Sequence, residues 1–243
     1  MEILSRVHAK NLVRWAKDRP EVLVLSADLT SSTEIDLFKE TYPDRFISLG
    51  VAEQNMLSFA GGLAREGFLP FIHTFAVFIY RRAYDQMAMS VAYPCLPVRM
   101  FGFLPGITSP GGASHQAIED IAMMRSLPNM TVVEVADATE IETILDAIEE
   151  VPGPVYVRML RGEVPRLFPA DEPLQLENQP RVNIGRLPRC ATTQRVGHKH
   201  QRPVARARAI WIPQLPLSIR DRPASRQRLE HNIQGPGTGT ADT

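Results

Sequence analysis

Short apolar runs alternate with longer segments of helical period along the first 170 residues of the chain. Each run is four to six residues long and rich in β-branched or aromatic side chains, which is typical of buried strands. The pattern predicts six strands, at 21–26, 46–49, 70–74, 97–101, 131–135 and 154–159.

Helices are predicted between these strands, at about 52–65, 78–92, 116–126 and 137–150. The clearest is the last, where apolar residues from Ile141 to Ile148 recur at the spacing of one helix face. Its start reads as a capping box, with Asp137 as the N-cap and Glu140 three residues on. Strands that alternate with helices predict an α/β fold: a parallel sheet flanked by helices on both faces. Ligands of such sheets bind beyond the carboxyl ends of the strands, so we expect the chemistry in the loops that follow them.

After about Phe168 the pattern stops, and an Arg/Pro-rich stretch without sustained period follows. From Asn178 to the end there are 12 Lys and Arg residues and 3 Asp and Glu residues, which give a net charge of +9. The whole chain has 27 basic and 27 acidic residues, so residues 1–177 have 15 basic and 24 acidic residues and a net charge of −9. We therefore expect a folded domain at 1–170 and a disordered tail at 171–243. Trp211 is the one aromatic residue of the basic stretch, so no nucleic-acid partner is expected.

The composition is that of an ordinary soluble protein, with a mean hydropathy of −0.13 and no apolar run that could cross a membrane. The N-terminus lacks the layout of a signal peptide. Cys95 and Cys190 are too few for a disulfide framework and have no metal-ligand spacing. We expect a cytoplasmic protein without a metal site of its own.

One stretch carries the most information about chemistry. A strand ends near Leu49, Gly50 turns the chain, and Glu53 enters the first turn of a helix. By itself, a carboxylate there is explained by the helix dipole. However, Pro43-Asp44-Arg45-Phe46 followed by Gly50-Val51-Ala52-Glu53-Gln54-Asn55-Met56 resembles the signature of the transketolase pyrimidine-binding domain.

That resemblance implies thiamine diphosphate as cofactor, with Glu53 as the catalytic acid that hydrogen-bonds N1′ of its aminopyrimidine ring. The role requires burial to favour the neutral carboxyl, against the helix N-terminus, which favours the charged form. Asp28, in the loop Ser26-Ala27-Asp28-Leu29-Thr30, is then expected near the cofactor, and Ser32 near a substrate phosphate. Turn and N-cap chemistry explains these two residues equally well.

The resemblance extends to three further segments. His73-Thr74-Phe75-Ala76-Val77-Phe78 matches the aromatic pocket around the pyrimidine, with Phe75 and Phe78 as its walls, although a third aromatic residue of many members is Arg81 here. Ser109 to Gln116 resembles the loop whose histidine contacts the ketose oxygens, which assigns substrate binding and proton transfer to His115. An aspartate of that loop is Gly111 in this chain, and its threonine is Ser114, so the resemblance does not determine the identity of the substrate.

In Arg158-Met159-Leu160-Arg161-Gly162, Arg161 fits the family's arginine for the acceptor phosphate. The Gly-Asp-Gly motif of the second, diphosphate- and Mg²⁺-binding domain does not occur in the chain. The resemblance therefore implies the C-terminal subunit of a split transketolase, whose N-terminal partner subunit holds the diphosphate and the metal. Homodimerisation of this chain would give a heterotetramer with two copies of each subunit, acting on sugar phosphates.

The family's third domain would follow Phe168, and the abrupt change to the tail resembles translation in a shifted reading frame. Two alternatives stay open. A fragment similar to deoxyxylulose-phosphate synthase is favoured by Arg82-Ala83-Tyr84-Asp85-Gln86, whereas Asn55 favours transketolase. A non-catalytic remnant that only binds a partner subunit is the other.

Overall fold

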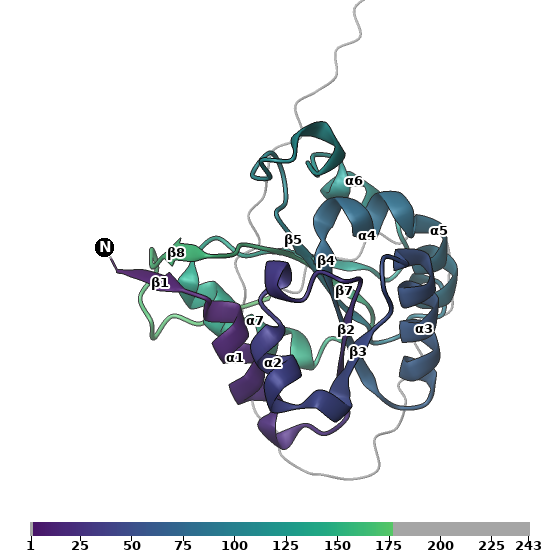
Figure 1. The fold of residues 1–243 in the computed structure, drawn as a ribbon, viewed down its shortest axis with the longest axis horizontal. Helices are drawn as coiled ribbons and strands as arrows, with labels where there is room; N and C mark the ends of the chain where they lie inside the picture. Colours follow the sequence, from purple (N-terminus) through teal and green to yellow (C-terminus); the bar gives the residue numbers. More distant parts are fainter. Residues whose placement is uncertain (1, 177–243) are drawn as a thin grey trace, which may run out of the picture. The chain divides into compact units, whose positions relative to one another are not determined.

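The computed structural model describes residues 2–176, which form a six-stranded, fully parallel sheet with helices on both faces (Figure 1). The strand order is β3-β2-β4-β5-β7-β6, and every neighbouring pair is parallel. The strands are β2 (Val22–Ser26), β3 (Phe46–Ser48), β4 (Leu69–Phe75), β5 (Arg99–Phe103), β6 (Thr131–Glu134) and β7 (Val155–Met159). The predicted fold class and all six predicted strands are confirmed.

Two groups of helices cover the sheet (Figure 1). One face carries α1 (Val7–Trp15), α2 (Asp36–Thr41) and α7 (Ala138–Glu149), and α1 contacts both of the others. The opposite face carries α3 (Glu53–Arg65), α4 (Ala76–Arg82) and α5 (Tyr84–Met87), while α6 (Asp120–Arg125) packs against α4 and β6. None of the described helices is both long and apolar enough to span a membrane.

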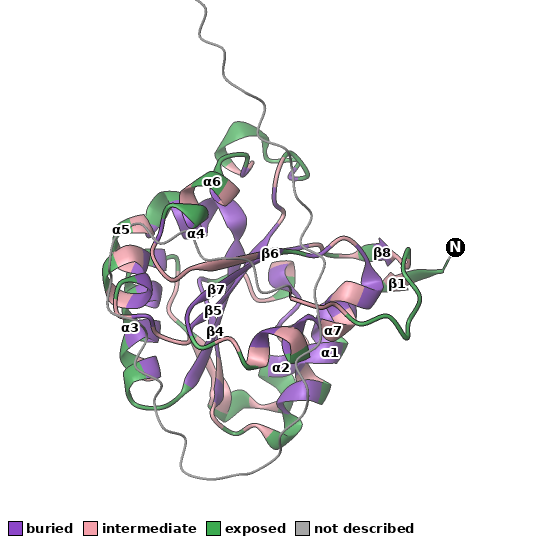
Figure 2. Ribbon diagram, turned by 180° about the vertical axis from the view of Figure 1, so that it is seen from behind, coloured by how far each residue is buried: buried purple, intermediate pink, exposed green. Residues whose placement is uncertain are grey.

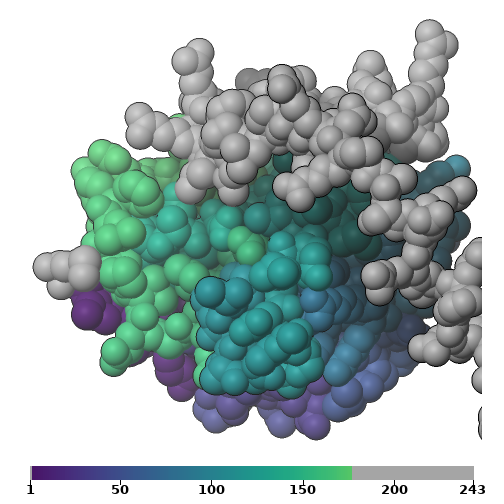
Figure 3. Space-filling model, turned by 90° about the horizontal axis from the view of Figure 1, so that it is seen from above, coloured from purple at the N-terminus to yellow at the C-terminus, as the bar shows by residue number. Residues whose placement is uncertain are grey.

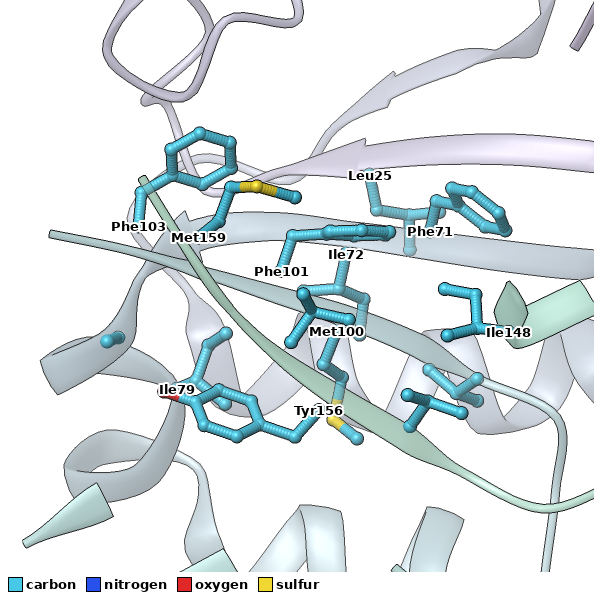
Figure 4. Packing of buried hydrophobic residues seen from close by; sticks show 14 of the residues in the cluster. Leu25, Phe71, Ile72, Ile79, Met100, Phe101, Phe103, Ile148, Tyr156 and Met159 are labelled. Atoms are coloured by element: carbon cyan, nitrogen blue, oxygen red, sulfur yellow. The ribbon is translucent and has the colours of Figure 1, made fainter. Parts of the chain in front are cut away.

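Successive side chains of the central strands point to opposite faces of the sheet. Phe71 and Phe101 lie on one side, and Ile72, Met100 and Tyr156 on the other (Figure 4). All five are essentially inaccessible to solvent. Figure 2 shows the central strands buried between the two helical layers. Because both faces are covered, these strands read in the sequence as continuous apolar runs rather than as an alternating pattern.

Two helix predictions need correction. The helix predicted at 78–92 begins earlier, at Ala76, and breaks at Ala83 into α4, α5 and the π-helical turn Ala88–Ala92. The helix predicted at 116–126 begins only at Asp120, because Ala117 pairs with Gly106 across an antiparallel bridge with N–O distances of 2.7 and 2.9 Å. Because of this tertiary pairing, residues 116–119 are not part of the helix.

A two-stranded antiparallel sheet, β1 (Ile3–Ser5) with β8 (Glu163–Pro165), joins the two ends of the described region. Beyond β8 the chain runs along α7, where Leu174 donates its backbone N–H to Thr143 Oγ1 over 2.9 Å. The predicted tail lies outside the described residues from 177 onwards.

Candidate active site at the carboxyl edge of the sheet

The residues assigned to catalysis and binding follow five different strands at one edge of the sheet. Asp28 follows β2, Glu53 follows β3, Phe75 ends β4, His115 lies in the loop after β5, and Arg161 follows β7. Because carboxyl ends of parallel strands meet at a common edge, residues far apart in the chain are gathered there.

Glu53 is placed by a tight turn between β3 and α3. Gly50 adopts φ +68°, a left-handed conformation that glycine takes at low cost, and its carbonyl accepts a hydrogen bond from the Ala52 N–H over 2.7 Å. The turn makes Glu53 the first residue of α3, and only 4% of it is exposed. A carboxyl at a helix N-terminus in a buried position is the arrangement that the sequence predicted.

The Glu53 carboxylate has a partner that sequence reasoning did not assign. Arg82, the last residue of α4, donates from Nη1 to Glu53 Oε1 over 2.6 Å. The same guanidinium lies over the Phe78 ring, 3.8 Å from its centroid. Phe78 in turn stacks with Phe75 at a centroid distance of 5.7 Å. Acid and aromatic pair thus form one continuous group, joined by Arg82.

His115 completes the group from the other side. Its imidazole meets Phe78 edge-on, with centroids 5.4 Å apart, and Phe75 at 6.4 Å. Its Nδ1 lies 2.9 Å from the Ser114 hydroxyl. The structure therefore brings together His115, both aromatic residues and, through Arg82, Glu53.

Arg81 anchors the His115 loop to α4. It donates to the Ala113 carbonyl over 3.1 Å and forms an ion pair with Glu119 at 2.9 Å. The Tyr80 hydroxyl donates to the same Glu119 carboxylate. These hydrogen bonds from Tyr80 and Arg81 lower the pKa of Glu119 to about 2. At the position where the sequence resemblance implied a third aromatic residue, this chain thus has an arginine that anchors the loop.

A cavity of about 560 Å³ opens between the loops after β4, β5 and β7, a volume in the range of small-molecule sites. Phe75, Gly111, His115 and Arg161 are among the residues that line it. Seen from above, the loop after β5 (teal) lies beside the segment after β7 (green) in Figure 3. Glu53 and Asp28 are outside the lining.

Arg161 lines this cavity and contacts Ser32, which is not part of the lining. Arg161 donates from Nη1 to the Ser32 carbonyl over 3.1 Å, and the Ser32 hydroxyl makes no hydrogen bond within the described part of the chain. Glu34 supports this corner because its buried carboxylate accepts the Gly162 N–H over 2.6 Å. Burial raises the pKa of Glu34 despite that hydrogen bond. Asp28 is exposed at the same sheet edge, with φ +61°, and its side chain forms no hydrogen bond or ion pair with another site residue in the part of the chain that the structure describes.

The carboxylate acceptor and the aromatic pair fit the pyrimidine half of thiamine diphosphate, a planar ring with N–H groups. Glu53 Oε2 accepts no hydrogen bond from the described residues, so it is open to a ring donor. Phe75 and Phe78 offer an aromatic surface next to it. The residues that the structure describes contain no group of three or more His, Cys, Asp or Glu that could hold a metal ion.

Comparison with known proteins gives the family. Residues 4–166 match the transketolase pyrimidine-binding domain family. The chain belongs to this family.

Three curated relatives illustrate its range. A putative uncharacterized transketolase family protein, y4mN, of Sinorhizobium fredii is 47% identical over 158 residues, which are 65% of this chain and 45% of the relative. The 6-deoxy-6-sulfo-D-fructose transketolase subunit SqwH of a Clostridium species is 40% identical over 157 residues, 64% of this chain and 49% of the relative. A 1-deoxy-D-xylulose-5-phosphate synthase of Mycolicibacterium gilvum is 35% identical over 165 residues, 68% of this chain and 26% of the relative.

A solved structure described as "Split gene transketolase, inactive beta4 tetramer" is also similar. It superposes with a TM-score of 0.62 at 42% sequence identity and covers 70% of this chain and 55% of its own. The chain thus spans about half the length of the first two of these relatives and of this structure.

Proposed function

We propose that this chain is the pyrimidine-binding subunit of a split transketolase, which transfers a two-carbon ketol unit from a phosphorylated ketose to an aldose. The observation that carries the proposal is the continuous group of Glu53, Phe78 and His115 beside a cavity that ends at Arg161. The names of two similar proteins, a transketolase subunit and a split-gene transketolase, support a divided enzyme.

Each residue has a role in this proposal. Glu53 holds a proton at N1′ of the ring, and Phe75 and Phe78 enclose the ring. Bound thiamine diphosphate supplies the carbon nucleophile of the reaction, and the chain supplies binding, orientation and proton transfer around it. His115 orients the ketose oxygens and moves a proton on the substrate side.

Arg161 binds the terminal anionic group of the sugar, and the hydroxyl of Ser32, whose carbonyl Arg161 contacts, is a further donor to that group. Phosphate is the first choice for this group, and the sulfonated sugar in the name of one relative makes a sulfonate the comparison to test. The separate N-terminal subunit supplies the diphosphate and Mg²⁺ site, and Asp28, exposed at the same sheet edge, lies on the cofactor side in this proposal.

Calorimetry with thiamine diphosphate and Mg²⁺ tests the proposal, with the partner subunit present and absent. We expect binding only with the partner present, and loss of ketol transfer in Glu53→Gln. Binding without transfer from any phosphorylated ketose, together with condensation of pyruvate and an aldose phosphate, would point to a deoxyxylulose-phosphate-synthase-like activity instead. Binding of the partner without the cofactor would leave only the non-catalytic role.

A further inference from the structure

Arg82 makes the same kinds of contact that the cofactor ring requires in the proposed site. Its guanidinium is planar, donates an N–H to Glu53 Oε1 over 2.6 Å, and lies 3.8 Å from the centroid of the Phe78 ring. An aminopyrimidine that is protonated at N1′ is also planar, also donates to a carboxylate and, in the proposed site, also lies against an aromatic wall. A planar cation with N–H donors is the protein group that most resembles it.

We propose that Arg82 is an internal stand-in for the aminopyrimidine ring: it occupies the place between Glu53 and Phe78 in the cofactor-free chain and is displaced when the cofactor binds. The inference rests on the proposed function. Phe78 is already in contact with Phe75 and edge-on with His115, and only 9% of the residue is exposed. Arg82 and a bound ring therefore compete for the same carboxylate and the same aromatic surface.

Glu53 gives a reason for such a stand-in. The residue is 4% exposed, and a buried carboxylate without a partner destabilises the folded state. Arg82 supplies that partner as long as no cofactor is present. This stabilisation weakens cofactor binding. The apparent affinity for the cofactor falls in proportion to the fraction of chains in which Arg82 occupies the place of the ring.

Arg82 is also able to leave. Its side chain is 44% exposed, and within the described residues its polar contacts are limited to Glu53. The neighbouring Arg81 is different, because it is tied to both the Ala113 carbonyl and Glu119. Because a bound ring would take over as the partner of Glu53, moving the half-exposed Arg82 head group into water leaves no buried carboxylate unpaired.

The test is calorimetric binding of thiamine diphosphate and Mg²⁺ to the full chain with its partner subunit, for the parent and for Arg82→Met. Methionine keeps an apolar stem against Phe78 but lacks the charge and the donors. We expect affinity to rise about tenfold, equivalent to about 1.4 kcal/mol. The melting temperature of the cofactor-free Arg82→Met chain should be lower, and this deficit should vanish at saturating cofactor.

Arg65→Ala is the matched control, since Arg65 is an exposed arginine at the opposite end of α3. It should change neither the affinity nor the melting temperature. Arg82→Lys, which keeps the charge but not the planar group, should bind with intermediate affinity and covers the case in which Arg82→Met does not fold.

An Arg82→Met chain that binds the cofactor equally well or more weakly would overturn the stand-in, while parent binding leaves the proposed function intact. If the parent with its partner does not bind the cofactor at all, both proposals fall together. Combining Arg82→Met with Glu53→Gln gives a further check: the gain in affinity should disappear, because the competition is for that carboxylate.

Discussion

The imidazole of His115 lies directly against the backbone of Gly111. A Cβ placed on Gly111 would come within 2.7 Å of His115 Cγ and 2.8 Å of its Nδ1, which real Cβ atoms do not tolerate. Gly111 has φ −74°, so space and not backbone conformation demands the glycine. The resemblance in sequence implied an aspartate at this position, and in this chain the His115 ring occupies the space in which a side chain on residue 111 would begin.

Gly111→Ala should therefore push the His115 ring out of position. A shift of about 1 Å in a catalytic group costs on the order of 100-fold in rate, so we expect a loss of that size in ketol transfer with the fold retained. Proton NMR of the imidazole resonances, beside a kinetic assay with the partner subunit, measures both effects.

Gly62→Ala is the matched control, because a Cβ on this α3 glycine would meet nothing within 4 Å. Alanine is favoured over glycine in a helix interior, so this variant should gain about 0.5–1 kcal/mol of stability and leave the rate unchanged. A Gly111→Ala chain with an unmoved imidazole and a normal rate would contradict the steric argument.

A buried histidine pair makes stability depend on pH. His8 of α1 and His73 of β4 face each other with their Nε2 atoms 2.9 Å apart, and both are fully buried. Burial lowers the pKa of His8 to about 3, and burial together with the neighbouring His8 lowers the pKa of His73. In the unfolded chain both titrate near 6.5, so the unfolded state takes up protons first as the pH falls.

The free energy of unfolding should thus be constant above about pH 7 and fall below about pH 6.5, by up to about 1.4 kcal/mol per pH unit for each histidine. Urea unfolding at pH 7 and pH 5 measures this slope. In the double variant His8→Leu/His73→Phe, which replaces both partners by apolar groups, the slope should be clearly smaller. Equal slopes in the two chains would show that other groups control the acid sensitivity.

Local patterns in the sequence predicted much of the fold. The apolar runs of the central strands identified the sheet because both of its faces are covered, and Asp137 and Glu140 marked the start of α7. Helix α1 was missed because its buried side includes the polar residues His8 and Asn11, which hide the apolar period. The three-residue strands β1 and β8 are too short for any periodicity.

In the candidate site, too, some residues were predicted from local sequence and others were not. Glu53 and His115 follow from a local resemblance in sequence, whereas the role of Arg82 depends on a contact across 29 residues that no local pattern encodes. Likewise, the helix break at Ala83 between α4 and α5 could not be predicted, because no glycine or proline marks it in the sequence. Non-local packing decided both features.

Asp137 does more than cap α7. One carboxylate oxygen accepts the Glu140 N–H over 2.8 Å, as predicted, and the other accepts the backbone N–H groups of Leu167 and Phe168, each at 2.8 Å. Asp137→Ala should lower the free energy of unfolding by about 2–4 kcal/mol, because a helix cap and the hydrogen bonds to the Leu167 and Phe168 N–H groups are lost together. Thermal or urea unfolding measures the change.

Thr143→Ala is a milder change in the same helix, since it removes one acceptor for the Leu174 N–H. It should cost about 1 kcal/mol. If the two variants were equally stable, the contacts of Asp137 with residues 167 and 168 would contribute nothing to stability.

Arg158 and Arg161 stand three residues apart at the end of β7, and the structure gives them different tasks. Arg158 is nearly buried and pairs with Asp120 at 2.8 Å and with Glu134, so it serves the fold. Arg161 is exposed at the cavity and uses one N–H on the Ser32 carbonyl, which leaves further donors for an anionic substrate.

Arg161→Ala should therefore raise KM for a phosphorylated aldose about 10- to 100-fold, the equivalent of a charge-assisted hydrogen bond, with little effect on melting temperature. For an unphosphorylated aldose the same variant should leave KM unchanged, because the guanidinium has no anion to meet. Arg158→Ala should show the reverse pattern, a strong loss of stability from the buried partner Asp120. If Arg161→Ala changed KM by the same factor for both aldoses, another residue would bind the anionic group.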